Sequence, residues 1–430
     1  MKTRYIFTVF TLLSLLPFSS CRDVIFEKSY RNVPVYMSYE EMRSAVVHEA
    51  PSGLKNPGKI YFKDGYIFIN EEMKGVHIID NRDPANPVNT GFIAIPGNMD
   101  IAIKGSILYA DSYVDLVAVD ISDLDGPKEV SRVKDVFPYT LPPLADETMP
   151  VDVIDKEKGV VAGWEVKLEN KRVESGYFPV YRSGWLNAKY DYATMPERGP
   201  GMNGTSFGIG GSMARFALYG DHLYAVDNRQ FHIFDTENEA KPLLVNEPYI
   251  NNASETIFIH DNNIFLGTRW GMMVYSLSDP VNPQYKASFS HIYSCDPVVV
   301  QDHIAYVTLR GGNECGSTVN RLDVYTLSEN YENAASAYSY NMTEPYGLAI
   351  DDEILFVCDG TKGLQIFDAS DISVIDKHKL ASFPDIKAYD VIPFEDHLFM
   401  IGSDGFYQYD YSDINNIHEI SKIPVKKGIK

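Results

Sequence analysis

Residues 117–123 read Val117-Ala118-Val119-Asp120-Ile121-Ser122-Asp123, a short apolar run that ends in Asp and passes into a polar turn. Variants of this phrase recur along the chain, and each ends in Asp or a hydroxyl residue: Asp80, Asp120, Asp235, Ser276, Thr326, Asp368 and Asp410. Successive phrase ends are 40, 115, 41, 50, 42 and 42 residues apart. Because strand-like units with a period near 40 are typical of propellers, the spacing predicts an all-β β-propeller of four-stranded antiparallel blades.

Each repeat begins with two apolar strands joined by a tight turn, as in residues 101–110 and 216–226, which have Gly105 and Gly220 at the bend. The third strand ends in the repeated phrase, and the fourth strand is more polar. An Asp side chain in a turn accepts a hydrogen bond from the backbone two residues later. We therefore expect the recurring Asp to stabilise turns and not to bind a metal.

The 115-residue interval is longer than one missing repeat requires. Residues 152–164 align without gaps with residues 390–402 of the last repeat. We therefore favour eight blades, one of them degenerate after its second strand, over the alternative of seven blades with a hairpin extension at 152–166. Residues 167–211 are rich in Gly and Tyr and are expected to form an insertion.

The first 20 residues have the pattern of a secretory signal, with Lys2 and Arg4 followed by a mostly apolar run. Ser19-Ser20-Cys21 is similar to the bacterial lipobox, which predicts that Cys21 is acylated and begins the mature chain. Residues 21–57 are then the anchor and a tether. The propeller is expected over residues 58–425, followed by a tail at 426–430.

The tether contains two patterns that predict local structure. Ser38 and Glu41 form a capping-box pattern, which predicts a short helix after Ser38. Residues 33–36 alternatively supply a strand that closes the ring, because closure removes two exposed sheet edges.

The formal net charge is −21, and it becomes −23 without residues 1–20, which hold two bases and no acid. Such a charge repels nucleic acid, so no nucleic-acid partner is expected. Three cysteines follow Cys21. Cys295 and Cys315 lie in one repeat and are a possible disulfide outside the cytoplasm, whereas Cys358 lies in an apolar strand and is expected to be buried.

The third strand followed by Asp-x-Ser-Asp resembles the LVIVD repeat of secreted bacterial β-propeller proteins. Residues 117–123 are the closest copy, and residues 368–371 and 410–413 repeat its ending. The opening segment at 33–41, after a lipobox, also resembles Bacteroidetes-type lipoproteins of this group. The resemblance covers residues 58–425 and implies a propeller that is lipid-anchored at the outer membrane or cell surface, but it implies little about activity.

Aligning the repeats places one residue of each at the head of the innermost strand, at the mouth of the central channel. These residues are Lys59, Asp100, Asp152, Arg215, Thr256 with Glu255 beside it, Asp296, Gly347 and Asp390. The carboxylates are oxygen ligands that suit Ca²⁺. Alternatively, Lys59 and Arg215 pair with them in a structural network, and acid–base catalysis is a third interpretation.

The insertion is a second candidate site, because long loops on rigid scaffolds often carry function. Its aromatic residues include Tyr177, Phe178, Tyr181, Trp185, Tyr190 and Tyr192. They are expected either to stack on a sugar or peptide or to pack on neighbouring blades.

These features favour a lipid-anchored, extracytoplasmic module that binds a protein partner or a glycan in the cell envelope. One alternative is a carbohydrate-active lyase or hydrolase that uses the mouth carboxylates Asp100, Asp152, Asp296 and Asp390. The other is a purely architectural lipoprotein of an outer-membrane complex. Neither G-x-S-x-G nor H-E-x-x-H occurs in the sequence, so binding is favoured over catalysis.

Overall fold

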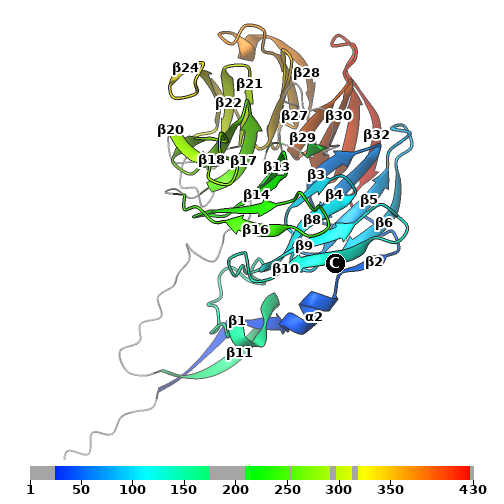
Figure 1. The fold of residues 1–430 in the computed structure, drawn as a ribbon, viewed down its shortest axis with the longest axis vertical. Helices are drawn as coiled ribbons and strands as arrows, with labels where there is room; N and C mark the ends of the chain where they lie inside the picture. Colours follow the sequence, from blue (N-terminus) through cyan, green and yellow to red (C-terminus); the bar gives the residue numbers. More distant parts are fainter. Residues whose placement is uncertain are drawn as a thin grey trace, which may run out of the picture.

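The computed structural model describes residues 25–173, 209–210, 212, 214–250, 254–290, 297–311 and 318–426. These residues form a β-propeller of seven blades, each containing four consecutive antiparallel strands (Figure 1). The predicted propeller is confirmed. The prediction of eight blades is wrong, and the alternative of seven is correct.

The blades follow one another along the chain, and the innermost strand of each comes first. Blades 1 and 2 consist of β3 (Pro57–Lys63), β4 (Tyr66–Glu71), β5 (Gly75–Asp80), β6 (Val88–Ala94), β7 (Ile101–Lys104), β8 (Ile107–Ser112), β9 (Asp115–Asp120) and β10 (Lys128–Val133). Blades 3 and 4 consist of β13 (Phe216–Tyr219), β14 (His222–Val226), β15 (Phe231–Asp235), β16 (Leu243–Asn246), β17 (Ser254–His260), β18 (Asn263–Thr268), β19 (Gly271–Ser276) and β20 (Gln284–Ser290). Blades 5 to 7 consist of β21 (Val298–Gln301), β22 (Ile304–Leu309), β23 (Arg321–Leu327), β24 (Ala334–Asn341), β25 (Leu348–Asp351), β26 (Ile354–Cys358), β27 (Leu364–Asp368), β28 (Lys379–Phe383), β29 (Ala388–Phe394), β30 (His397–Gly402), β31 (Gly405–Asp410) and β32 (His418–Pro424).

The repeated sequence phrase forms the third strand of a blade and the turn after it. In blade 2 the first five residues of β9 are buried, because neighbouring blades cover both faces of the sheet, whereas β10 is partly exposed. Asp120 Oδ1 accepts a hydrogen bond from the backbone N–H of Ser122 at 2.8 Å. The same turn bond recurs at Asp80, Asp235, Ser276, Asp368 and Asp410. The structural interpretation of the recurring Asp is confirmed.

The tether contains helix α2 (Tyr39–Ser44), which begins at the capping box of Ser38 and Glu41 expected from the sequence. Strand β2 (Val47–Glu49) follows and adds to the outer edge of blade 1 beside β6. Met42 of the helix is buried in a small apolar cluster with Val114 of blade 2. The tether is therefore packed against both of the first two blades.

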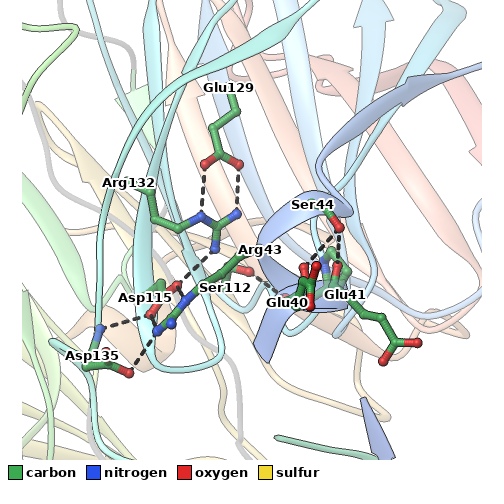
Figure 2. Close-up of polar contacts among 10 residues, drawn as sticks. Glu40, Glu41, Arg43, Ser44, Ser112, Asp115, Glu129, Arg132 and Asp135 are labelled. Atoms are coloured by element: carbon green, nitrogen blue, oxygen red, sulfur yellow. Dashed lines mark hydrogen bonds and ion pairs between the residues drawn. The ribbon is translucent and has the colours of Figure 1, made fainter. Parts of the chain in front are cut away.

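An arginine of α2 fixes the helix to blade 2 (Figure 2). Arg43 Nε and Nη2 donate to the two carboxylate oxygens of Asp115 at 2.8 and 3.0 Å, and Nη2 also contacts Asp135 at 2.8 Å. Arg132 approaches Asp115 from the other side at 3.2 Å. Burial alone would raise the pKa of Asp115, but the bonds from Arg43, the Asp135 N–H and the charge of Arg132 hold it below its usual value. We call this contact the Arg43–Asp115 latch.

Strands β1 (Ile25–Met37) and β11 (Val160–Val173) form a separate antiparallel ribbon, which projects from the propeller beyond blade 2 (Figure 1). Residues 152–166 are therefore not part of an eighth blade, and residues 33–36 do not close the ring. The two segments pair with each other instead. The short helix η1 (Lys156–Lys158) precedes β11, and η2 (Ile375–Lys377) lies in blade 6. Among the described residues, no helix has the length and apolar character needed to span a bilayer.

The ring closes between blades 1 and 7 through side chains, and within the described residues these blades share no strand. Phe62 of β3 packs against Phe394 and Phe399 of blade 7, with ring centroids 4.4 and 5.0 Å apart. Gln408 Nε2 donates to Asn81 Oδ1 at 2.7 Å across the same boundary. We call this boundary the seam.

Candidate functional site

The mouth face is the face of the propeller on which the innermost strands begin. Because successive strands are antiparallel, it also carries the turns between the second and third strands of each blade. Lys59 and Asp100 form an ion pair there and are almost completely buried. Asp100 Oδ2 also accepts hydrogen bonds from the backbone N–H groups of Arg215 and Phe216 at 2.5 and 3.2 Å. Burial lowers the pKa of Lys59, and the charge of Asp100 partly offsets this shift.

A second carboxylate, that of Asp111, holds the backbone at Asp100 in place. Asp111 Oδ1 accepts hydrogen bonds from Met99 N at 2.7 Å, Asp100 N at 2.9 Å and Asn98 Nδ2 at 2.9 Å. Burial raises the pKa of Asp111 to about 6, and the nearby charge of Asp100 acts in the same direction. The repeat pattern does not single out Asp111, because its hydrogen bonds join β8 to the segment at 98–100 that leads into β7.

Three other predicted mouth residues, Asp390, Glu255 and Asp152, have contacts of their own. Asp390 lies beside Gly347, where a Cβ atom would be 2.5 Å from Asp390 Oδ1. Glu255 Oε1 is 2.8 Å from Arg269 Nε. Asp152 is not at the head of an innermost strand, because its backbone N–H donates to Asn32 O of the ribbon.

Asp296 lies outside the described residues, and so do Cys21, Cys295 and Cys315. The aromatic residues of the predicted recognition loop are also outside them: Tyr177, Phe178, Tyr181, Trp185, Tyr190 and Tyr192. Within the described residues, no three His, Cys, Asp or Glu side chains are grouped so as to hold a metal ion. The Ca²⁺ prediction therefore has no ligand set in this part of the chain. Cys358 is fully buried, as its apolar strand predicts.

The end of the insertion runs through the central channel. Strand β12 (Ile209–Gly210) pairs with β3, the innermost strand of blade 1. Ser212 Oγ accepts a hydrogen bond from Leu348 N of blade 6 at 2.9 Å, and Ala214 O accepts one from Ile257 N of blade 4 at 2.8 Å. Because one segment contacts the innermost strands of three blades, it occupies the channel that these strands enclose.

A rigid turn displays an aromatic side chain on the mouth face of blade 4. Trp270 is 56% exposed and lies between β18 and β19. Thr268 Oγ1 donates to Gly271 O at 2.6 Å and accepts from Trp270 N at 3.3 Å. Gly271 has a φ of +148°, and a Cβ there would lie 2.2 Å from Phe289 O, so the turn requires glycine. The neighbouring Arg269–Glu255 pair holds the turn against the head of β17.

A second exposed ring lies on the mouth face where blade 3 leads into blade 4. Tyr249 is 65% exposed and forms a bridge with Gln230, in the turn between β14 and β15. The next residue, Ile250, is buried and donates its N–H to Arg229 O at 2.5 Å. Tyr249 is thus held by backbone bonds while its ring faces solvent.

Trp270 and Tyr249 were not predicted from the sequence. Both lie in connections much shorter than the predicted insertion at 167–211. The available signal was Thr268-Arg269-Trp270-Gly271, a large aromatic residue at a turn where the repeat predicts small or polar residues.

Comparison with known proteins supports the repeat assignment. Residues 97–135, which include all of blade 2, match the family model described as LVIVD repeat. No curated protein matches this chain in sequence.

Several solved structures align with most of the chain at low sequence identity. The computationally designed Ika8 protein aligns at 8% identity and a TM-score of 0.48, covering 88% of this chain and 90% of Ika8. PorZ of Porphyromonas gingivalis aligns at 9% identity and a TM-score of 0.46, covering 88% of this chain and 39% of PorZ. KlHsv2 aligns at 10% identity and a TM-score of 0.45, covering 85% of this chain and 99% of KlHsv2. From the matched repeat and the seven blades, the chain is a β-propeller that carries an LVIVD repeat in its second blade.

Proposed function

We propose that this chain is an extracytoplasmic binding or scaffold module, anchored through acylated Cys21, that holds a protein partner or a glycan on its mouth face. The signal and lipobox patterns support the location. The propeller fold supports a binding role, because its rigid blades present loops on one face. Residues 209, 210, 212 and 214 of the chain itself lie in the channel, which favours the surface of the mouth face over the channel interior as the binding site.

The main structural support for this proposal is the exposed side chain of Trp270. A tryptophan ring buries a large apolar area on contact, and aromatic rings on protein surfaces commonly stack against sugars and peptide groups. Thr268, Gly271 and the Arg269–Glu255 pair hold the turn in place, so binding costs little additional ordering. Tyr249 offers a second ring on the same face.

Crosslinking on intact cells, followed by capture of the protein and mass spectrometry, tests the partner. The variants Trp270→Ala and Tyr249→Ala are expected to lose the captured partner, or binding to an isolated envelope polysaccharide, while their thermal unfolding stays unchanged. Tyr285→Ala is the matched control, because Tyr285 is 57% exposed but lies on β20, the outermost strand of blade 4. Equal binding by all three variants and the wild type would reject the mouth face as the site.

Anchoring is tested separately with Cys21→Ser. The wild-type protein is expected in the membrane fraction with a diacylated N-terminal cysteine, and the variant is expected to leave that fraction. A wild-type protein that starts with an unmodified residue after Cys21 would contradict the anchor.

A further inference from the structure

The β1–β11 ribbon has two chemically different faces. Residues directly opposite each other in an antiparallel pair share a face, so Tyr30 and Leu168 lie together, and Val166 follows on the same side. Tyr30 and Leu168 are 54% and 55% exposed, and Val166 is 41% exposed. The opposite face carries the paired charges Lys167 and Glu165. We call the side with Tyr30, Val166 and Leu168 the apolar ribbon face.

Among the residues that the structure describes, contacts with the propeller cover this face where the ribbon meets it. Asn32, on the same side, is fully buried, and its Nδ2 donates to Asp146 O at 2.7 Å and Met149 O at 2.9 Å. Trp164 Nε1 donates to Pro142 O at 2.9 Å. Beyond these contacts the apolar ribbon face continues without cover among the described residues. An apolar surface that continues from a packed interface points to an occupant from outside the chain.

The ribbon also differs from the rest of the protein in charge. The chain carries a net charge of −21, yet strand β1 contains Lys28 and Arg31 against one acid, and β11 contains three bases against two acids. Aromatic and aliphatic side chains next to basic ones are typical of segments that lie at a membrane surface. The acidic propeller is repelled by an anionic surface, but the ribbon is not.

The position of the ribbon near the predicted anchor indicates what covers the apolar ribbon face. Strand β1 begins four residues after Cys21, and four extended residues reach at most about 14 Å. We propose that the apolar ribbon face lies in the interfacial layer of the membrane that holds the anchor, with Tyr30, Val166 and Leu168 toward the acyl chains. This inference rests on the proposed anchoring at Cys21. It adds a second membrane contact beside the acylated cysteine.

Brominated lipids, which quench tryptophan fluorescence at short range, test which face meets the membrane. Trp164, Trp185 and Trp270 are replaced by Phe in the chain that starts at Cys21, and one new tryptophan is introduced, as Leu168→Trp or as Lys167→Trp. A lipid thioester is ligated to the N-terminal cysteine, and the protein is bound to vesicles of phosphatidylethanolamine and phosphatidylglycerol with brominated phosphatidylcholine. The matched pair differs only in the face of the ribbon that carries the probe.

The Leu168→Trp protein is expected to be quenched about twofold more strongly than the Lys167→Trp protein. Equal quenching of the two probes, or quenching of neither, overturns the proposal. A dimer in sedimentation, with the probe at 168 shielded but not quenched, would also overturn it and assign the face to a second copy. Chemical ligation makes the result independent of acylation in cells, so failure here is distinguishable from failure of the proposed anchor, which Cys21→Ser tests.

Discussion

One carboxylate oxygen of Asp111 organises the start of blade 2. Three N–H donors converge on Oδ1, and two of them belong to the backbone of Met99 and Asp100. Asp100 in turn pairs with Lys59 and bonds the head of blade 3. The arrangement places two carboxyl groups close together in a poorly solvated region, which explains why the pKa of Asp111 is raised by burial and by the charge of Asp100.

Asp111→Asn is expected to change how stability depends on pH. The pKa of Asp111 is about 6 in the folded protein and about 4 in the unfolded chain, so its protonated form stabilises the fold. This stabilisation is complete below pH about 4 and is lost as the pH rises to about 6, with a size on the order of 1–3 kcal/mol. The variant retains Oδ1 as an acceptor but does not titrate. Its free energy of unfolding should therefore not show this loss between pH 4 and 6. Urea unfolding at pH 4, 5, 6 and 7 measures the free energy of unfolding of both proteins. If this free energy changes with pH in the same way in both, the assignment is contradicted.

The contrast between Asp111 and Asp120 shows which roles of single residues can be predicted from the sequence. Asp120 bonds the N–H two residues later, so its role follows from local sequence and recurs with the repeat. Asp111 lies on β8 and bonds the segment before β7, and no local pattern distinguishes it. Trp270 was missed for a related reason, because its exposure depends on how Gly271 and Glu255 hold the turn.

At the scale of elements, the Arg43–Asp115 latch holds helix α2 against blade 2. Asp115 has no exposed side-chain surface, and Arg43 is its closest cationic partner. Arg132 and the Asp135 N–H also contact it, so the carboxylate remains partly compensated when Arg43 is removed. The ribbon continues directly into α2, and the latch therefore also fixes the base of the ribbon.

Arg43→Ala is expected to lower the free energy of unfolding by about 1–3 kcal/mol, because it removes the main partner of a buried carboxylate. Hydrogen exchange should accelerate mainly in residues 38–49, as α2 and β2 detach before the blades open. Arg82→Ala is the control, since the Arg82–Asp80 pair is exposed, and its removal should change the free energy of unfolding far less. A loss of equal size in both variants, or exchange that is faster throughout the propeller, would count against the latch.

At the scale of elements, the similarity of residues 152–164 to the last repeat correctly indicates a strand only at residues 160–164, because the residues aligned with β29 do not form one. It does not indicate the partner. Val160 begins β11, which pairs with β1 about 130 residues earlier in the chain, whereas the residues aligned with it pair within blade 7. Strand propensity is local, but pairing is decided by which other strand is left without a neighbour. The N-terminal strand supplied that neighbour, and an eighth blade did not form.

The whole ring depends on the seam between blades 1 and 7. Propellers that share a strand between the first and last blades fix this boundary with backbone hydrogen bonds. Here Phe62 stacks between Phe394 and Phe399, and Gln408, itself fully buried, bonds Asn81. The seam also includes a backbone bond from Lys426 N to Leu54 O at 2.7 Å. Packing of side chains therefore provides most of the closure.

Phe62→Ala is expected to cost about 3–5 kcal/mol, because it leaves a cavity at a boundary that has little backbone support. Hydrogen exchange should then accelerate first in β3 and β30, on either side of the seam. Phe265→Ala, in the core between blades 4 and 5, is the control and should cost a similar amount without loosening β3. If β3 keeps its protection in the Phe62 variant, the seam is not the weakest boundary of the ring.

The direct passage from β1 into α2 has a mechanical consequence for a protein held at Cys21. Tension on the anchor enters β1 and first meets the base of the ribbon, where β1 pairs with β11 and Asn32 bonds Asp146 O and Met149 O. It next reaches α2, where Met42 and the Arg43–Asp115 latch hold the chain to blade 2. Drag on a bound partner would therefore act first on the base of the ribbon and on this helix, and the sheets of the ring would bear the load only after these contacts had yielded.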